Sequence, residues 1–288
     1  MQALAAWLTS RPQNAVMGLA VTLLLPAPQL TSGVILVLLI LAQGIRQALG
    51  EALIAAAVLV TVSLLFGVSI ASIAALMAGT WIPVVLLSIL LLGTRSLTLV
   101  MQISVIVVAV AMLGFYVVVT DPVAFWEPYR QAMIEIAGQN NLQLNTEMFT
   151  ADVMTVSAAL AFWMLYAVGL LLGYALYKRL PRETATLGGF RDLNFGRVIA
   201  FTVALTSLLA FFVDAVWVQN LAFLMFVVFW LQGLAIVHWM HAQGILPLAA
   251  LIAVYVLLPI LQVLLMTALA VFGYMDAWFG FRRRMKKA

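Results

Sequence analysis

The sequence predicts an all-α fold, a polytopic transmembrane helical bundle with eight or nine membrane segments. Of its 288 residues, 66% are hydrophobic and only 8% are charged, whereas soluble domains are about half apolar and about a quarter charged. Many apolar runs approach the roughly 20 residues that a helix needs to cross a hydrocarbon core about 30 Å thick. The runs do not alternate polar with apolar residues, which favours helices over a membrane barrel.

The apolar runs define the expected helices in chain order. They cover residues 14–25, 30–45, 51–67, 69–92, 97–120, 152–177, 198–214, 219–238 and 245–273. The first two are short and are separated by Pro26 and Pro28, so we expect a shallow hairpin there. Seven glycines in these runs are expected to permit close helix approach, namely Gly18, Gly67, Gly79, Gly114, Gly169, Gly173 and Gly233.

Charged residues mark the predicted loops. Arg11, Arg46 and Arg95 follow zero, two and four expected crossings, an alternation that the positive-inside rule requires of a chain whose N-terminus is cytoplasmic. The charge pattern therefore predicts a multi-pass membrane protein with its N-terminus in the cytoplasm. The whole chain, residues 1–288, is then one integral membrane domain, and the lipid bilayer is its first partner.

Residues 121–151 are expected to form an extracytoplasmic loop with an amphipathic helix. Acidic residues dominate this segment, with Arg130 as the one basic residue. Apolar positions recur at helical spacing opposite polar ones. The apolar face comprises Trp126, Tyr129, Met133 and Ile136, and the polar face comprises Glu127, Arg130, Gln131 and Glu135, with the helix ending at Gly138.

Two basic segments are expected on the cytoplasmic side: the loop at residues 178–197 and the C-terminal tail at residues 276–288. Residues 198–275 would add further helices between them. That stretch holds three apolar runs, yet two segments on one side demand an even number of crossings. Either one run does not cross fully, or Pro259 and Gln262 split the last run into a re-entrant pair, or the tail lies outside. We favour eight full spans with one partial element among the last three.

Ionisable and amide side chains inside apolar runs are the candidates for ligand binding, because a charge in hydrocarbon costs about 3 kcal/mol or more. Arg46 and Glu51 lie near a predicted membrane boundary, where they act either as anchors or as contacts to a substrate or partner. Asp214, Gln219 and Asn220 fall in a predicted outer turn. If that turn dips into the bundle, they would form a polar cluster suited to a cation or polar solute.

Interhelical hydrogen bonding is the plain interpretation of the amides Gln43, Gln102, Gln232 and Gln262. Among these, Gln232 is also a candidate ligand contact. His238 and His241 share a helix face, but no third ligand lies nearby, so no metal site is predicted. Asp276 is expected to pair with Arg282 or with a neighbouring helix.

Composition argues against several classes of protein. The sequence contains no cysteine, which excludes disulfides and cysteine-ligated metals. No hydrolase elbow, phosphate loop or pair of catalytic carboxylates is present, so we expect no enzyme and no cofactor. The net charge of +4 resides mostly at helix ends, so no nucleic-acid partner is expected either.

Three short motifs carry a resemblance to a known family. They are residues 273–284 (GYMDAWFGFRRR), residues 232–237 (QGLAIV) and the Pro26 to Pro28 turn followed by Gly44, Ile45 and Arg46. With these motifs the chain resembles the YybS-like family of predicted bacterial multi-pass membrane proteins. That family is distantly similar to the substrate-binding subunits of energy-coupling factor (ECF) transporters, which have six helices.

The resemblance implies a six-helix core at residues 14–178 and, as partners, an ATPase or a coupling membrane subunit. The docking motif of those subunits is not evident in this sequence. We therefore expect an inner-membrane protein that binds a small solute or belongs to a transport system. The alternative is a scaffold that recruits proteins or anionic lipid through its basic cytoplasmic segments.

Overall fold

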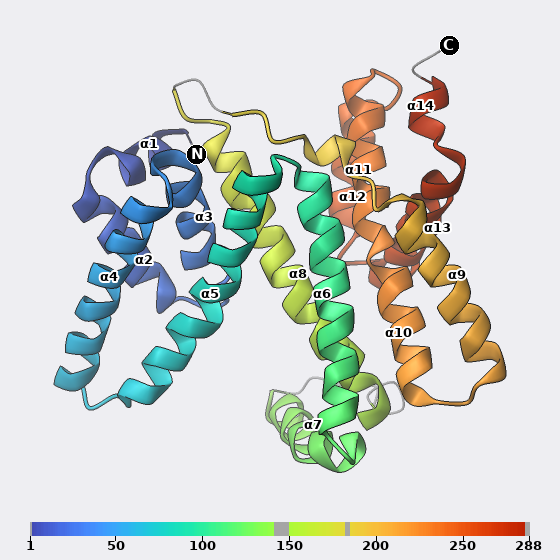
Figure 1. The fold of residues 1–288 in the computed structure, drawn as a ribbon, viewed down its shortest axis with the longest axis horizontal. Helices are drawn as coiled ribbons and strands as arrows, with labels where there is room; N and C mark the ends of the chain where they lie inside the picture. The colour runs from blue at the N-terminus through green and yellow to red at the C-terminus, as the bar shows by residue number, and fades with distance from the viewer. Residues whose placement is uncertain (1, 141–149, 182–184, 286–288) are drawn as a thin grey trace. The chain divides into compact units, whose positions relative to one another are not determined.

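The computed structural model describes residues 2–140, 150–181 and 185–285, and every regular element within these ranges is a helix (Figure 1). Six stretches are long and apolar enough to cross a bilayer. They are α4 (Ile45–Leu65), α5 (Ile70–Thr94), α6 (Leu97–Val118), α8 (Ala151–Tyr177), α10 and α11 taken together (Val216–Ala242), and α13 (Gln262–Phe279). The all-α prediction is therefore confirmed, and the long apolar helices support a membrane protein.

The remaining helices are shorter. Three of them are apolar: α3 (Ser32–Gln43), α9 (Gly196–Phe212) and α12 (Leu248–Leu257). The others are α1 (Gln2–Ser10), α2 (Pro12–Leu23), α7 (Pro122–Gln139), the 3-10 helix η1 (Phe190–Asp192) and α14 (Phe281–Met285), while α10 (Val216–Val227) and α11 (Phe229–Ala242) are separated by Val228 alone.

Large apolar side chains point outward from the long helices. Leu53 of α4 is 72% exposed and Val117 of α6 is 85% exposed, and both lie in the middle or end of uninterrupted apolar sequence. In water such surfaces would drive aggregation, whereas hydrocarbon accommodates them. The outward faces thus agree with the composition of the chain.

The helices group into two compact units. The first comprises residues 1–100 and 164–188, and the second comprises residues 101–163 and 189–288. Helices α6 and α8 each contribute residues to both units.

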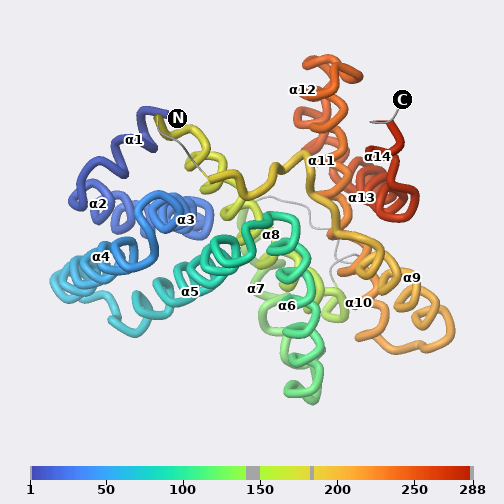
Figure 2. The backbone as a smooth tube through the Cα atoms, turned by 45° about the horizontal axis from the view of Figure 1, so that its top comes forward, coloured from blue at the N-terminus to red at the C-terminus, as the bar shows by residue number. Residues whose placement is uncertain are grey.

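Helix α3 is the centre of the first unit (Figure 2). Its sequence is apolar on all faces, and residues 34–41 are at most 8% exposed, as expected for a helix that is enclosed on every side. It packs against α2, α4 and α5. Its polar groups are bonded inside the unit: Ser32 Oγ donates to the carbonyl of Leu19 over 3.0 Å and accepts from Trp81 Nε1 over 2.9 Å.

The expected hairpin at the N-terminus is formed by α2 and α3. Each helix has 12 residues, about 18 Å of rise, and the two pack against each other across the turn that contains Pro26 and Pro28. Thr31 Oγ1 closes the turn by donating to the carbonyl of Thr22 over 2.7 Å. The two short apolar runs of the sequence therefore form two short helices.

The apolar run at 245–273 is split, as one of the three parity alternatives predicted. Helix α12 ends at Leu257, residues 258–261 include Pro259, and α13 begins at Gln262. Proline lacks a backbone donor and disfavours a helical residue before it, so the break falls where the sequence requires it. The 10 residues of α12 rise only about 15 Å, and α13 returns beside α11.

Helix α7 lies where an amphipathic helix was expected between residues 121 and 151, with Glu147 lying outside the described residues. Its N-cap is Asp121, whose carboxylate accepts from the backbone N–H of Ala124 over 3.0 Å. On the polar face, hydrogen bonds from Arg130 and Gln131 lower the pKa of Glu127 to about 2. This ionised pair persists at neutral pH and is lost only as the pH falls toward that value.

The glycine prediction is confirmed at four positions. A Cβ at Gly18, Gly169, Gly173 or Gly233 would lie 2.6, 2.9, 2.5 or 2.0 Å from an atom of another helix or turn. At Gly67, Gly79 and Gly114 the prediction is wrong, because a Cβ there would meet nothing within 4 Å.

The contact between α11 and α13 depends on two glycines. At Gly233 the nearest atom to an added Cβ is the carbonyl oxygen of Leu269, and at Gly273 it is the carbonyl oxygen of Phe229, 2.3 Å away. Both neighbours are backbone atoms, which cannot rotate away as a side chain could. Gly273, which the sequence did not single out for packing, is thus as essential to this contact as Gly233.

We predict that Gly233→Ala destabilises the protein by about 1–3 kcal/mol, the typical effect of overpacking, because α11 and α13 must separate. Gly114→Ala is the matched control, since it adds the same methyl group to a helix where nothing lies within 4 Å. It should leave stability unchanged or raise it by up to about 1 kcal/mol. Unfolding of the detergent-purified variants by heat measures both, and equal stability of the two would contradict the packing argument.

Candidate binding cavity at the junction of loop and tail

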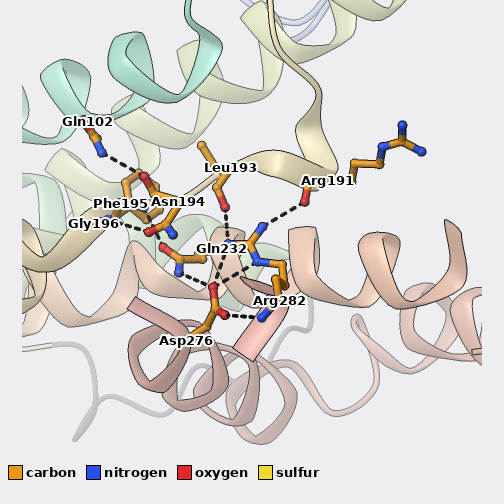
Figure 3. Close-up of polar contacts among 9 residues, drawn as sticks. All are labelled: Gln102, Arg191, Leu193, Asn194, Phe195, Gly196, Gln232, Asp276 and Arg282. Carbon is orange, nitrogen blue, oxygen red and sulfur yellow. Dashed lines mark hydrogen bonds and ion pairs between the residues drawn. The ribbon is translucent and has the colours of Figure 1, made fainter. Parts of the chain in front are cut away.

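A carboxylate near the end of α13 and a guanidinium at the start of α14 meet inside the second unit (Figure 3). Helix α13 ends at Gly280, which has a φ of 60° and whose N–H donates to the carbonyl of Asp276 over 2.8 Å. This left-handed conformation is the usual helix C-cap and is strained for residues other than glycine. It turns the chain so that Arg282 folds back onto Asp276.

The ion pair between Asp276 and Arg282 confirms one of the two pairings expected for Asp276. Arg282 Nη2 and Nε lie 2.7 and 3.0 Å from the same Asp276 oxygen, Oδ2. The two side chains are 1% and 9% exposed. A buried ion pair needs further hydrogen bonds to be tolerated, because desolvation of both charges opposes it.

Those further bonds come from the basic loop. Arg282 Nη1 donates to the carbonyl of Arg191 over 2.9 Å, and Nη2 donates to the carbonyl of Leu193 over 2.8 Å. The tail therefore holds the loop through backbone atoms. Within the expected basic segments, Arg182, Lys286 and Lys287 lie outside the described residues.

Gln232 of α11 connects the pair to the next part of the loop. Its Nε2 donates to Asp276 Oδ2 over 3.1 Å, and its Oε1 accepts from the backbone N–H of Phe195 over 2.7 Å. The interhelical bond expected of this amide is thus formed, between α11 and α13. Gln232 is fully buried, and its two hydrogen bonds connect the ion pair to the loop backbone.

The loop itself is not helical between η1 and α9, so its backbone groups need partners from side chains. Gln102 Nε2 of α6 donates to the carbonyl of Asn194 over 2.9 Å. Asn194 Oδ1 accepts from the N–H of Gly196 over 2.7 Å. Three helices, α6, α11 and α14, therefore fix this loop through Gln102, Gln232 and Arg282, and Asp276 of α13 holds Arg282 in place.

A cavity of about 230 Å³ adjoins this network. Its lining combines charged, amide and aromatic groups from the loop, the end of α11 and the end of α13. The residues are Asp192, Asn194, Trp239, Asp276, Gly280, Arg282 and Arg283. The volume is below the roughly 300–1,000 Å³ of pockets for drug-sized ligands, so the cavity suits a small solute or a single headgroup.

Arg46 and Glu51, expected to lie together at a boundary, form no ion pair within the described ranges. Arg46 is exposed, whereas Glu51 is only 3% exposed. The Glu51 carboxylate instead accepts from Gln43 Nε2 over 2.7 Å and from Gln47 Nε2 over 3.2 Å. These residues belong to the first unit and are no part of the cavity described above.

Of the three residues expected to cluster before α10, the structure brings two together and turns the third away. Gln219 Nε2 donates to Asp214 over 3.1 Å at an exposed position. Asn220 faces inward, where its Nδ2 donates to Tyr116 Oη over 2.5 Å and to the carbonyl of Asp152 over 2.7 Å. Asn220 thereby ties α10 to α6 and α8, and Asp214 stands apart from it.

His238 and His241 have neighbours other than each other. His238 Nε2 lies 2.6 Å from Tyr255 Oη, and His241 Nδ1 lies 3.0 Å from the carbonyl of Leu246. A search of the described residues finds no group of three side chains able to hold a metal ion.

Sequence reasoning identified Gln232, Asp276 and Arg282 but not the cavity. In the sequence, Asp192 and Asn194 are ordinary polar residues of a loop, and Trp239 is an ordinary interfacial tryptophan. Their spacing does not predict that they lie together. One signal was present: an acidic residue inside an apolar helix, followed by a glycine and three arginines at the C-terminus.

Comparison with known proteins yields no relative: no protein-family model, curated protein or solved structure matches this chain. The resemblance to the YybS-like family therefore stays a prediction, and the function rests on the geometry described above.

We predict that Asp276→Leu and Arg282→Met, taken singly, each destabilise the second unit by about 3–5 kcal/mol, because each leaves an uncompensated buried charge. The double variant should lose much less than the sum, since it removes both charges. Chemical unfolding of the four proteins in detergent measures the coupling. Strictly additive losses would show that the two side chains do not act as a pair.

Proposed function

We propose that this protein is a membrane-embedded solute-binding protein that works as a subunit of a transport system. The cavity between the basic loop and the tail carries this proposal. Charged and amide groups line it, and the loop that forms one of its walls is bonded by side chains from three helices, so its walls are held before any ligand arrives. Preorganised polar walls in an otherwise apolar protein are what binding a small polar solute requires.

The geometry favours access from the side of the basic segments. The cavity lies between residues 192–194 and 280–283, which belong to the basic loop and the tail. In this proposal an ATPase or coupling membrane subunit is the partner, and the six-helix core at residues 14–178 is retained as part of the same hypothesis. The protein carries out no catalysis of its own.

The proposed topology is that of a bacterial inner-membrane protein with eight or nine segments and a cytoplasmic N-terminus. The contacts of Arg282 with the carbonyls of Arg191 and Leu193 support a common side for loop and tail. An even number of crossings between them follows, with α12 and α13 acting as the split pair. The proposed count also requires short helices such as α3 and α9 to cross the membrane.

Cysteine labelling tests this topology, because the sequence contains no cysteine of its own. We expect Gln139→Cys to react with a membrane-impermeant maleimide in intact cells. Lys178→Cys and Met285→Cys should react only after permeabilisation, as residues of the cytoplasmic loop and tail. Labelling of Gln139→Cys and Lys178→Cys from the same compartment would refute the proposed arrangement.

Ligand binding is tested by thermal unfolding of the purified protein with a panel of amino acids, sugars, nucleosides, vitamins, carboxylates and phosphate esters. A solute that binds only the folded state stabilises it, by about 2.7 kcal/mol at one hundred times its dissociation constant. The variant Arg283→Gln should reduce the shift while leaving the Asp276–Arg282 pair intact.

Asp214→Asn is the matched control, since it neutralises an exposed acid that does not line the cavity. Its response to the active solute should equal that of the unaltered protein. No shift with any solute, or an unchanged shift in Arg283→Gln, would reject the cavity as the binding site.

The second candidate function is the scaffold, which the exposed positions of Lys178, Arg191 and Arg284 favour. These side chains project from the same basic segments and are available to acidic partners or anionic lipid. The solute panel separates the two functions, because a scaffold gains no stability from any small solute.

A further inference from the structure

Trp239 has a buried polar atom without a partner. The residue is 3% exposed, and its indole Nε1 has no hydrogen-bond acceptor among the described residues. Leaving such a donor buried and unpaired is unfavourable, and tryptophan N–H groups normally find an acceptor. Trp239 lies near the end of α11 and lines the cavity described above.

A missing partner alone does not indicate a ligand. Trp230, on the same helix, also has an unpaired buried Nε1, yet it does not line this cavity. Trp239 differs because it lines the cavity, so an acceptor bound there would be its neighbour. The two tryptophans therefore form a natural comparison within one helix.

Other donors face the same cavity. The guanidinium of Arg283 has no ion pair in the described part of the chain, and the amide nitrogen of Asn194 donates no hydrogen bond there. Arg282 and Asp276, by contrast, satisfy each other and contribute little net charge. Within the described ranges, the groups without partners are thus the indole N–H of Trp239, the amide NH2 of Asn194 and the guanidinium of Arg283. The lining also includes one exposed acid, Asp192.

We propose that this cavity binds an anionic phosphate group, which accepts hydrogen bonds from Trp239 Nε1 and Asn194 Nδ2 and pairs with Arg283. This assignment rests on the proposed function and names its ligand class. Phosphate oxygens are acceptors that match a fork of guanidinium donors. The group is carried either by a soluble phosphate ester or by a phospholipid headgroup, since basic pockets at membrane boundaries recognise both.

The lining contains two carboxylates. Asp276 is paired with Arg282, whereas Asp192 has no ion pair among the described residues and would repel a bound anion. Removing its charge should therefore tighten phosphate binding, because a like charge near the ligand disappears. We expect Asp192→Asn to bind phosphate esters several-fold more tightly. Weaker binding by this variant would overturn the assignment, because it would mean that the ligand needs a carboxylate.

Nuclear magnetic resonance of protein labelled at the indole nitrogens tests the contact directly, as the sequence contains only 8 tryptophans. Trp239→Phe and Trp230→Phe each delete one indole signal and so assign it. Titration with glycerol 3-phosphate should shift the Trp239 signal downfield, as expected for a newly formed hydrogen bond, and leave the Trp230 signal in place.

Affinity measurements separate the two sources of the phosphate group. Calorimetry with glycerol 3-phosphate and inorganic phosphate in detergent reports on a soluble ligand. Nanodiscs of phosphatidylglycerol, compared with discs of an uncharged glycolipid, report on a headgroup through the same Trp239 signal. A response in either arm supports the phosphate site and identifies its source.

Trp239→Phe should weaken phosphate binding about tenfold, the loss expected for one hydrogen bond to a charged group, while Trp230→Phe should not change it. Arg283→Gln should weaken binding and reduce its dependence on salt. Equal affinities for both tryptophan variants, or no shift of the Trp239 signal in either arm, would overturn the proposal. If phosphates fail but another solute of the panel binds, the phosphate assignment falls and the solute-binding function stands.

Discussion

A polar group inside an apolar helical bundle must bond to another polar group of the protein, because neither hydrocarbon nor aliphatic side chains offer a partner. The arrangement of the second unit follows from this constraint. Gln232 can satisfy its amide only by reaching Asp276 and the backbone of Phe195, which brings α11, α13 and the loop together. The same rule fixes Asn220 against Tyr116 and Asp152, so α10 joins α6 and α8.

The ion pair of Asp276 and Arg282 contributes specificity more than it contributes stability. Desolvation of two charges largely cancels their attraction, and an apolar pair of similar volume would pack as well. A charged pair, however, tolerates only one position of the tail, in which the guanidinium meets both Asp276 and the carbonyls of residues 191 and 193. This one position of the tail fixes the wall of the cavity.

Close packing between helices depends on where side chains are absent. Gly233 and Gly273 let the backbones of α11 and α13 approach closely. A Cβ added at Gly233 would lie 2.0 Å from a carbonyl oxygen, and one added at Gly273 would lie 2.3 Å from another, both too short for a contact. In the first unit Gly173 has the same role against Val37 of α3. Small residues and bonded amides thus act together, because only closely packed helices bring short polar side chains within reach of each other.

The sequence by itself determined the all-helical fold and the apolar outward surfaces, since both depend on local composition and periodicity. It offered the break at Pro259 as one of three alternatives, and Arg282 as one of two partners for Asp276, six residues away. Only the tertiary structure decided that Asn220 turns away from Asp214, that Glu51 bonds amides rather than Arg46, and that Asp192, Asn194 and Trp239 share a cavity. Those outcomes depend on which helices become neighbours and how each helix is rotated, and hydrophobic runs without a polar face do not encode that rotation.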